Sequence, residues 1–398
     1  MDAVLRLVDA LWHVVGLLLL LVLFAEYGID GLRRLNRRLR YRRARLPERS
    51  ATAAAYRGAD WTVAYFDEFA GGVRVDWRPY VGWWQRPYRG RLVTLDERGL
   101  RPTPGEADAG ADALRILCFG GSTMMGMGAR DGATIAAVLA RRLGDLGHRV
   151  AVTNFGQLGH NSTQEVISLQ QALKAGMLPH LVLFYDGINE MACAEQTGRA
   201  DRLFNEARRQ AEFNLLHPDR RHDLMVAALM AAIPRTLRRL RRLTGLPLRG
   251  PLPQPEADLR AIDADALAGA VLATYAANLR TVRLLAREWG FRVLFFWQPV
   301  IATKAAKSPD EARFAADYTG DPAARHRLYN AVVAARRADP QIAAADDAFD
   351  LSRLFDDCGE PVYIDLYHLS ETGNAAVAEA MLPAVAAALT AAGGRSKV

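Results

Sequence analysis

The chain has 398 residues, of which 51% are hydrophobic and 24% charged, with a net charge of +7. This globular composition suits one large domain with appendages or two domains. Residues 1–50 hold ten arginines against five acidic residues, so most of the positive charge lies there. A body close to neutral argues against nucleic-acid binding, and three cysteines without paired or metal-like spacing argue against a disulfide framework.

Residues 10–29 form an apolar stretch, ALWHVVGLLLLLVLFAEYGI, in which only His13 and Glu26 can ionise. As a helix it would be about 30 Å long, which matches the hydrocarbon core of a bilayer. A cleaved signal peptide fits less well, because Arg6 is the only basic residue before the stretch and no small-residue cleavage site follows the leucines. A core helix fits less well too, because five consecutive leucines leave no polar face. We predict a single-pass N-terminal membrane anchor.

Eight arginines follow the apolar stretch, between Arg33 and Arg45. The positive-inside rule predicts that this flank, and with it the body of the protein, lies in the cytoplasm. The same arginines would also suit anionic lipid headgroups. The run lacks stacking aromatic residues apart from Tyr41, so no nucleic-acid partner is expected.

Three segments are predicted. Residues 1–46 form the anchor and its arginine-rich flank, and residues 47–113 form an aromatic-rich lead-in of short strands and turns that packs on the main domain. Residues 114–398 form the main domain, in which short apolar strands alternate with helices. Such alternation predicts a parallel sheet covered on both faces. The predicted strands are residues 115–119, 149–156, 180–187 and 291–299, and the predicted helices are 131–148, 162–177 and 375–389, with Ser162 and Glu165 as a capping box.

A long, mostly helical insertion is predicted at about residues 193–289, between the third and fourth strands. Within it, the sequence DLMVAALMAAIPRTLRRLRRL places an apolar run before five arginines. Two interpretations are open: a core-packed helix with a solvated basic end, or a lid that docks on the membrane surface.

Each of the first three predicted strands ends in a polar or glycine-rich motif: GGST, NFGQLGHN and YDGINE. In parallel sheets the ligand site lies at the carboxyl ends of the strands. A phosphate-binding loop is excluded, because no lysine lies between Gly120 and Arg149 and the glycine spacing does not fit a dinucleotide fingerprint. Two interpretations of the GGST motif remain: an ordinary strand-to-helix turn, or a turn that exposes Ser122 as a reactive group.

The motif DLYH near the C-terminus supplies what a reactive serine needs. A serine hydroxyl is a weak nucleophile that requires a base, and a carboxylate orients that base. Asp365 and His368 stand three residues apart, a spacing that also fits a helix cap. Attack by Ser122 would create an oxyanion, for which the backbone N–H groups of Ser122 and Gly159 and the amide of Asn189 are candidate donors.

In these blocks the chain resembles the SGNH (GDSL-type) serine hydrolase superfamily, from about residue 114 to the C-terminus. Ser122 in FGGST matches the family's nucleophile, and Gly159 in NFGQLG and Asn189 in GINE match its oxyanion residues. Asp365 and His368 in DLYH match the rest of its catalytic triad. The resemblance implies a flavodoxin-like three-layer α/β/α sandwich with a parallel sheet.

Two residues depart from the family pattern: Gly121 stands where many members have aspartate, and Glu190 replaces the aspartate of GxND. Both put substrate preference in doubt more than catalysis. The anchored layout also resembles a bacterial subgroup whose members often face the periplasm or the cell exterior, the side opposite to the one that the arginines predict.

Together these features predict a membrane-anchored serine esterase that acts on a carbohydrate or lipid ester through an acyl-enzyme, with no metal or cofactor. The alternative is an O-acyltransferase that uses the same triad to modify a surface polysaccharide or glycolipid. A third possibility is a non-catalytic membrane scaffold. The expected partners are an ester-bearing saccharide or lipid and the membrane.

Overall fold

A computed structural model describes residues 2–28, 49–110, 112–215, 233–244, 260–316 and 321–393, together with residues 225, 226, 228 and 230. The predicted arginine run between Arg33 and Arg45 lies outside the described residues. The chain divides into two compact units. One comprises Met1–Pro47 and Asn205–Pro255; the other, here called the sheet unit, comprises Glu48–Phe204 and Glu256–Val398.

The sheet unit is built on a five-stranded sheet in the order β6-β5-β7-β8-β9, with all pairs parallel. This is the flavodoxin-like order, which reverses direction between β5 and β7. The predicted fold class is therefore confirmed. The strands are β5 (Leu114–Gly120), β6 (Val150–Asn154), β7 (Leu181–Asp186), β8 (Arg292–Trp297) and β9 (Ala348–Asp350). Only β9 was not predicted, because three residues are too few to show a period.

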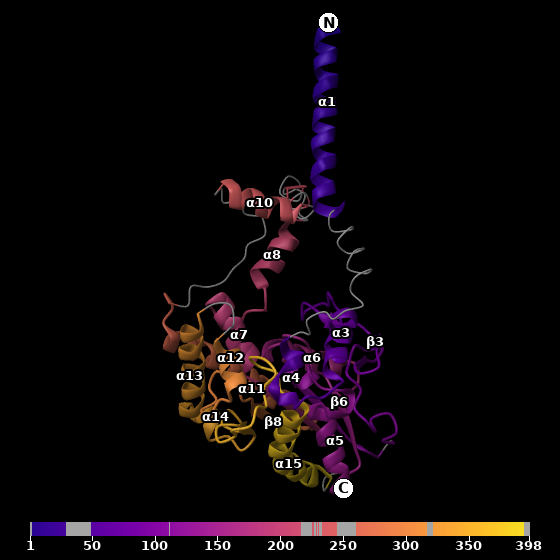
Figure 1. The fold of residues 1–398 in the computed structure, drawn as a ribbon. Coiled ribbons are helices and arrows are strands. Elements are labelled where there is room, and N and C mark those ends of the chain that lie inside the picture. The colour runs from indigo at the N-terminus through magenta and orange to yellow at the C-terminus, as the bar shows by residue number, and fades with distance from the viewer. Residues whose placement is uncertain are drawn as a thin grey trace. The chain divides into compact units, whose positions relative to one another are not determined.

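Helices cover both faces of the sheet (Figure 1). One face packs against α5 (Ile135–Asp145) and α15 (Glu371–Gly393). The opposite face packs against α6, α7, α11 and α13, which gives the three layers. These four helices span Ser162–Lys174, Ile188–Thr197, Ala264–Trp289 and Pro322–Ala338.

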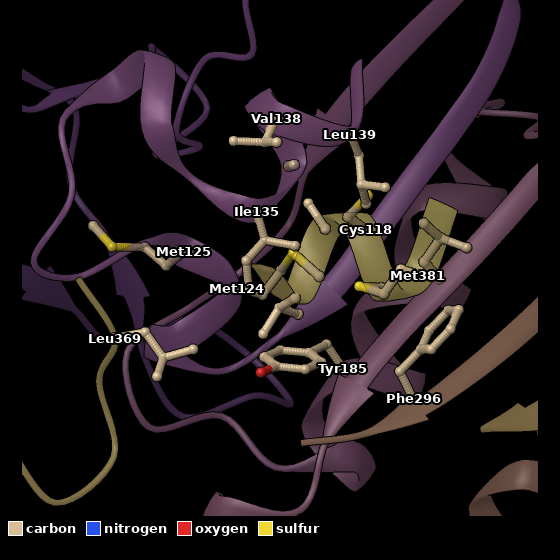
Figure 2. Packing of buried hydrophobic residues seen from close by; sticks show 14 of the residues in the cluster. Cys118, Met124, Met125, Ile135, Val138, Leu139, Tyr185, Phe296, Leu369 and Met381 are labelled. Carbon is tan, nitrogen blue, oxygen red and sulfur yellow. The ribbon is translucent and has the colours of Figure 1, made fainter. Parts of the chain in front are cut away.

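Strand side chains alternate between two apolar cores. Cys118, Tyr185 and Phe296 point into the core that also holds Met381 of α15 (Figure 2). On the other face, the ring of Phe184 stacks on those of Phe119 and Phe295, with centroids 5.3 and 5.4 Å away. Burial on both faces explains why these strands read as continuous apolar runs.

The N-terminal transmembrane helix is not supported by the structure. Helix α1 (Asp2–Leu23) forms, but its apolar part among the described residues is Ala10–Val22, about 20 Å of helix. Among those residues the helix long and apolar enough to cross a membrane is instead at the C-terminus, Glu371–Ala391 within α15. Its Val377, Met381 and Val385 are buried in the core, which accounts for its apolar character.

The lead-in forms the predicted short strand pairs and also one helix that was not predicted, α3 (Thr62–Gly72). The sequence of α3 is TVAYFDEFAGG, and the side chains of Tyr65 and Phe66 are buried. The remaining lead-in elements are η2 (Arg49–Thr52), η3 (Ala54–Tyr56), β1 (Val75–Asp76), β2 (Trp84–Gln85), β3 (Tyr88–Arg89) and β4 (Thr94–Leu95).

Other described helices complete the chain. The predicted insertion contributes α8 (Glu206–Leu215) and the arginine-rich α10 (Pro234–Thr244) to the first unit, whereas its last helix, α11, belongs to the sheet unit. Part of the insertion lies outside the described residues. The short elements are η1 (Phe24–Gly28), α4 (Ser122–Met125), η4 (Asp131–Ala133), α12 (Pro309–Ala316) and α14 (Pro340–Ala343).

Candidate active site

Ser122 stands at the carboxyl end of β5, beside the point where the strand order reverses. Gly121 is extended, and Ser122 begins the single turn of α4, which ends at Gly126 in the left-handed conformation. The N–H of Gly126 donates back to the carbonyl of Ser122 at 3.0 Å, which closes the turn. The tight strand-to-helix turn leaves the Ser122 side chain half-buried at the sheet edge.

The three residues of the predicted triad lie in one hydrogen-bonded row. Ser122 Oγ is 2.7 Å from His368 Nε2, and His368 Nδ1 is 2.7 Å from Asp365 Oδ2. Ser122 and His368 are 246 residues apart in sequence, and the sheet brings them together. This is the geometry in which a base can take a hydroxyl proton while a carboxylate holds the ring.

Asp365 is held by its own loop. Its Oδ1 accepts hydrogen bonds from the backbone N–H groups of Tyr367 and His368, both at 2.8 Å. Burial alone would raise the pKa of Asp365, but the His368 ring and these two N–H groups outweigh burial and lower it. The carboxylate is therefore ionised at neutral pH and orients the imidazole, as the DxxH spacing predicts.

The three predicted oxyanion donors come from three different strand ends: Ser122 after β5, Gly159 after β6 and Asn189 after β7. In the described part of the chain, the N–H groups of Ser122 and Gly159 donate to no protein acceptor. Asn189 Nδ2 donates to the carbonyl of His160, which fixes the amide and leaves one of its two hydrogens for a ligand.

Gly121 explains one departure from the family pattern. A Cβ built on this residue would lie 2.0 Å from Asn189 Nδ2, although the backbone φ of −78° would accept any residue. The Asn189 amide therefore occupies the space that a side chain at position 121 would need. Glycine at this position leaves room for the amide against the backbone of the residue that precedes Ser122.

We expect Asn189→Ala to lower kcat for ester hydrolysis by about 10²–10³, the loss typical of one oxyanion donor. Gly121→Ala should lower kcat as well, because the new methyl group displaces the Asn189 amide. Steady-state kinetics on p-nitrophenyl acetate would measure both, with Asn330→Ala, an exposed position on α13, as the control. A normal kcat in Asn189→Ala would remove this residue from the oxyanion site.

Glu190 explains the other departure. Its carboxylate accepts the N–H of Ser162 at 2.6 Å and the N–H of Gly187 at 2.8 Å. It thus ties the start of α6 to the turn that carries Asn189. The longer glutamate has a structural role here, which sequence reasoning did not reveal.

The predicted capping box of Ser162 and Glu165 is wrong by one residue. The helix cap is Asn161, whose side chain accepts the N–H of Gln164 while Gln164 Oε1 accepts the N–H of Asn161. Glu165 is instead buried, because its side chain turns toward Asp186 at the end of β7. Asn161 and Gln164 have the same three-residue spacing as Ser162 and Glu165, and both pairs consist of residue types found in capping boxes. Spacing in the sequence therefore cannot tell which pair caps the helix.

Glu165 and Asp186 form a buried carboxyl pair behind the site, with exposures of 2% and 4%. Burial raises the pKa of both well above the usual range, and a neighbouring carboxylate adds to the effect in each case. Their folded pKa values lie above the unfolded ones, so the folded state holds protons that the unfolded chain releases. The pair therefore lowers stability as the pH rises above about 4.

Residues of the lead-in hold the loop that follows Ser122 by hydrogen bonds. Arg101, whose side chain is fully buried, donates to the carbonyls of Gly126 and Ala129 and to Asp131. Tyr65 accepts the N–H of Gly128 at 2.8 Å. These residues were not identified from sequence, because an arginine and a tyrosine in an aromatic-rich segment give no signal of their long-range partners.

A buried ion pair supports the loop of Asp365 and His368. Lys304 Nζ lies 2.7 Å from Glu311 Oε2, with side-chain exposures of 1% and 0%. Glu311 Oε1 also accepts the N–H of Val362 at 3.0 Å, three residues before Asp365. Burial alone would raise the pKa of Glu311, but Lys304 and the backbone donors lower it.

We expect Glu311→Gln to cost about 3–5 kcal/mol in the free energy of unfolding at pH 7, because it leaves Lys304 charged and unpaired inside the protein. The depressed pKa means that this stabilisation is present above the unfolded pKa of about 4.3 and is lost as the pH falls below it. Urea unfolding at pH 7 and at pH 3.5 would measure both values. The control is Glu360→Gln, which breaks an exposed pair with Arg57 and should change little. A deficit of equal size at both pH values would contradict the assignment.

Among the described residues, no three histidine, cysteine, aspartate or glutamate side chains lie close enough together to hold a metal ion. Cys118 is fully buried, and burial raises the pKa of its thiol to about 12, so it is inert.

No protein-family model matches the chain, and no curated protein is similar to it in sequence. Solved structures are similar to it. An acetyl xylan esterase is 14% identical and aligns over 68% of this chain and 100% of its own, with a TM-score of 0.36. A member of the lipolytic G-D-S-L family from Veillonella parvula is 11% identical over 68% and 97%, with a TM-score of 0.34. An acetyl xylan esterase from Geobacillus stearothermophilus is 14% identical over 68% and 94%, with a TM-score of 0.34.

Proposed function

We propose that this protein is a serine esterase of the SGNH type. Its catalytic domain would be residues 114–398, interrupted by the insertion whose residues 205–255 belong to the other compact unit, and the lead-in up to residue 113 would be part of the same unit as the triad. The observation that carries the proposal is the row of short contacts from Ser122 Oγ through His368 to Asp365. Isolated serine–histidine contacts are common, but a half-buried serine at the carboxyl end of a strand, with a base and its orienting carboxylate in line, is typical of a nucleophile.

His368 Nε2 takes the proton of Ser122 as Ser122 Oγ attacks the ester carbonyl. The carbonyl π bond opens, and its electrons form an oxyanion that the N–H groups of Ser122 and Gly159 and the Asn189 amide stabilise. As the oxyanion collapses, the ester C–O bond breaks, and His368 donates its proton to the leaving alcohol. Water then attacks the acyl-enzyme while His368 takes its proton; the bond to Ser122 Oγ breaks, His368 returns the proton to Oγ, and the acid is released.

The same residues would serve an O-acyltransferase, in which a sugar or lipid hydroxyl replaces water in the second half. Hydrolysis is the primary proposal because it requires no acceptor site besides the groups described. Transfer would appear as an acylated acceptor when a polysaccharide or glycolipid is added to the assay.

We further propose that the N-terminal helix attaches the protein to a membrane. In α1 the described large apolar side chains are mostly exposed, among them Leu11, Trp12, Leu17 and Leu20, which are 60–71% exposed. Such a surface suits lipid. Full-length protein should sediment with lipid vesicles, and protein lacking residues 1–46 should stay in the supernatant. Protease protection in vesicles of known orientation would show on which side of the membrane the protein lies. The arginines predict the cytoplasmic side, and the resemblance predicts the exterior side.

Fluorophosphonate labelling of the detergent-purified protein tests the esterase proposal. The probe phosphonylates only an activated serine, so wild type should be labelled, whereas Ser122→Ala and His368→Ala should not. Circular dichroism would establish that both variants are folded. Absence of label on folded wild-type protein would contradict the esterase and favour a membrane scaffold without catalytic activity.

A further inference from the structure

The backbone N–H of Gly159, a predicted oxyanion donor, belongs to a peptide plane that its own residue does not fix. Gly159 has a φ of +70°, in the left-handed region that glycine adopts readily. The same peptide plane carries the carbonyl of Leu158. Because glycine tolerates many backbone conformations, this plane can rotate at little cost, and rotation would redirect the N–H. A hydrogen bond to the Leu158 carbonyl would hold the plane in one orientation.

Trp83 of the lead-in makes that hydrogen bond. Its Nε1–H donates to the carbonyl of Leu158 at 2.6 Å. In a planar trans peptide the C=O and the N–H point in opposite directions, so a contact that fixes one of them fixes the other. The indole ring also lies against Gly159, because a Cβ on that residue would be 3.6 Å from Trp83 Cζ2. The indole thus sets the direction of the Gly159 N–H.

A second contact of Trp83 leads to another predicted oxyanion donor, Asn189. The carbonyl of Trp83 lies 3.0 Å from His160 Nε2, and a carbonyl only accepts, so this nitrogen carries a hydrogen. His160 is 1% exposed, and its carbonyl accepts the hydrogen bond of the Asn189 amide. Trp83 therefore supports the Gly159 N–H directly and the Asn189 amide through His160.

The loop that the indole holds also touches the nucleophile turn. The N–H of Gln157 donates to the carbonyl of Gly120 at 3.0 Å. A Cβ on Gly121 would lie 3.3 Å from the carbonyl oxygen of His160. The loop is therefore in contact both with the lead-in and with the strand end that carries the nucleophile.

The neighbouring tryptophan, Trp84, makes a comparison possible. Trp83 and Trp84 are 4% and 7% exposed, and their rings meet the His160 ring edge-on, with centroids 5.4 and 5.8 Å away. Their indole N–H groups have different acceptors, because Trp84 Nε1 donates at 2.8 Å to the carbonyl of Arg98 in the lead-in. The two residues share their ring packing, and of the two only Trp83 donates to the turn of Gly159.

We propose that Trp83 is a positioning residue of the oxyanion site, whose indole N–H fixes the direction of the Gly159 N–H. This rests on the proposed esterase function. Trp83 acts through the Leu158–Gly159 peptide and does not touch the substrate. It stands before residue 114, where the resemblance to the SGNH family begins, so the lead-in supports catalysis as well as folding.

The substitution Trp83→Phe tests this role, because it keeps an aromatic ring and removes the N–H that binds Leu158. Formation and hydrolysis of the acyl-enzyme both pass through an oxyanion, so kcat on p-nitrophenyl acetate should fall about tenfold to a hundredfold whichever step limits the rate. KM should be unchanged, because the uncharged ester of the ground state gains little from these donors. Complete labelling with a fluorophosphonate would count the active sites, so that kcat refers to folded protein.

The matched control is Trp84→Phe, which removes the same N–H from the adjacent indole and should leave kcat as in wild type. Urea unfolding would compare the stability of the two variants. If Trp83→Phe does not fold, site-specific replacement of Trp83 by 3-benzothienylalanine makes the same test. That residue has sulfur in place of the N–H and keeps the shape of the two rings, and it should give the same loss of kcat.

Three results would overturn the role of Trp83. A wild-type kcat in Trp83→Phe would mean that the N–H is not needed. A raised KM at unchanged kcat would indicate a contact with the substrate, and equal losses of kcat in Trp83→Phe and Trp84→Phe would indicate general packing. Wild-type protein without esterase activity is a separate outcome, which contradicts the esterase proposal and with it the role of Trp83.

Discussion

Replacing Ser122 with alanine should lower kcat for p-nitrophenyl acetate by about 10⁴-fold or more. The variant loses the oxygen that forms the acyl-enzyme, and His368 then has no hydroxyl to activate. Losses for serine nucleophiles in comparable triads reach about 10⁶, and the remaining rate comes from the oxyanion donors and from binding. Only the side chain oxygen is removed, so the free energy of unfolding should change little.

The matched control for this substitution is Ser168→Ala. Ser168 is buried in α6, whereas Ser122 is half-buried, and its hydroxyl donates to the carbonyl of Gln164 at 2.8 Å within the helix, so it is a serine with no place in the triad. Its kcat should equal that of wild type. A Ser122→Ala protein that retains full activity after removal of contaminating esterases would exclude Ser122 as the nucleophile.

Asp365→Asn should lower kcat by about 10⁴-fold while the loop remains folded. The asparagine oxygen can still accept the backbone N–H groups of Tyr367 and His368. Its NH₂ group would then face His368 Nδ1 and donate to it. The imidazole would have to carry its own proton on Nε2, toward Ser122, where it cannot accept the hydroxyl proton.

Activity and stability together separate this tautomer effect from simple unfolding. Because Asp365 has a lowered pKa in the folded state, its ionised form stabilises the protein above the unfolded pKa of about 3.9, and that contribution is lost as the pH falls. Asp365→Asn should therefore be less stable than wild type at pH 7, with a smaller difference at pH 3. The control is Asp357→Asn, an exposed residue nearby. A kcat within tenfold of wild type would contradict the assigned role of Asp365.

The sheet was predictable because each strand carries its own signal. β5, β7 and β8 are buried on both faces, and that burial requires apolar runs that are visible in the sequence. The strand β9 was not predicted because it has only three residues, and the helix α3 was not predicted because its aromatic and glycine residues resemble those of the turns around it. Local patterns are reliable only where an element is long enough to repeat them.

The sequence indicates which residues make up the candidate site, but it does not indicate the residues that hold the loops of the site in place. Ser122, Gly159 and Asn189 each follow a predicted strand, and parallel strands end at one edge of a sheet, so their convergence follows from topology. The supports are different. Arg101 holds the carbonyl of Gly126 and Glu311 holds the N–H of Val362, contacts that span 25 and 51 residues. Neither residue stands in a pattern that indicates its partner.

The sequence by itself therefore determined the order of the strands along the chain, the edge at which they end and the chemical groups available there, because these depend on local periodicity and residue type. Only the tertiary structure decided the distances within the row from Ser122 to Asp365, the reason for glycine at position 121 and the hydrogen bonds from Arg101 to the loop after Ser122. Those features depend on which side chains fill the same space, and packing of that kind is set by the whole fold and not by any one segment of it.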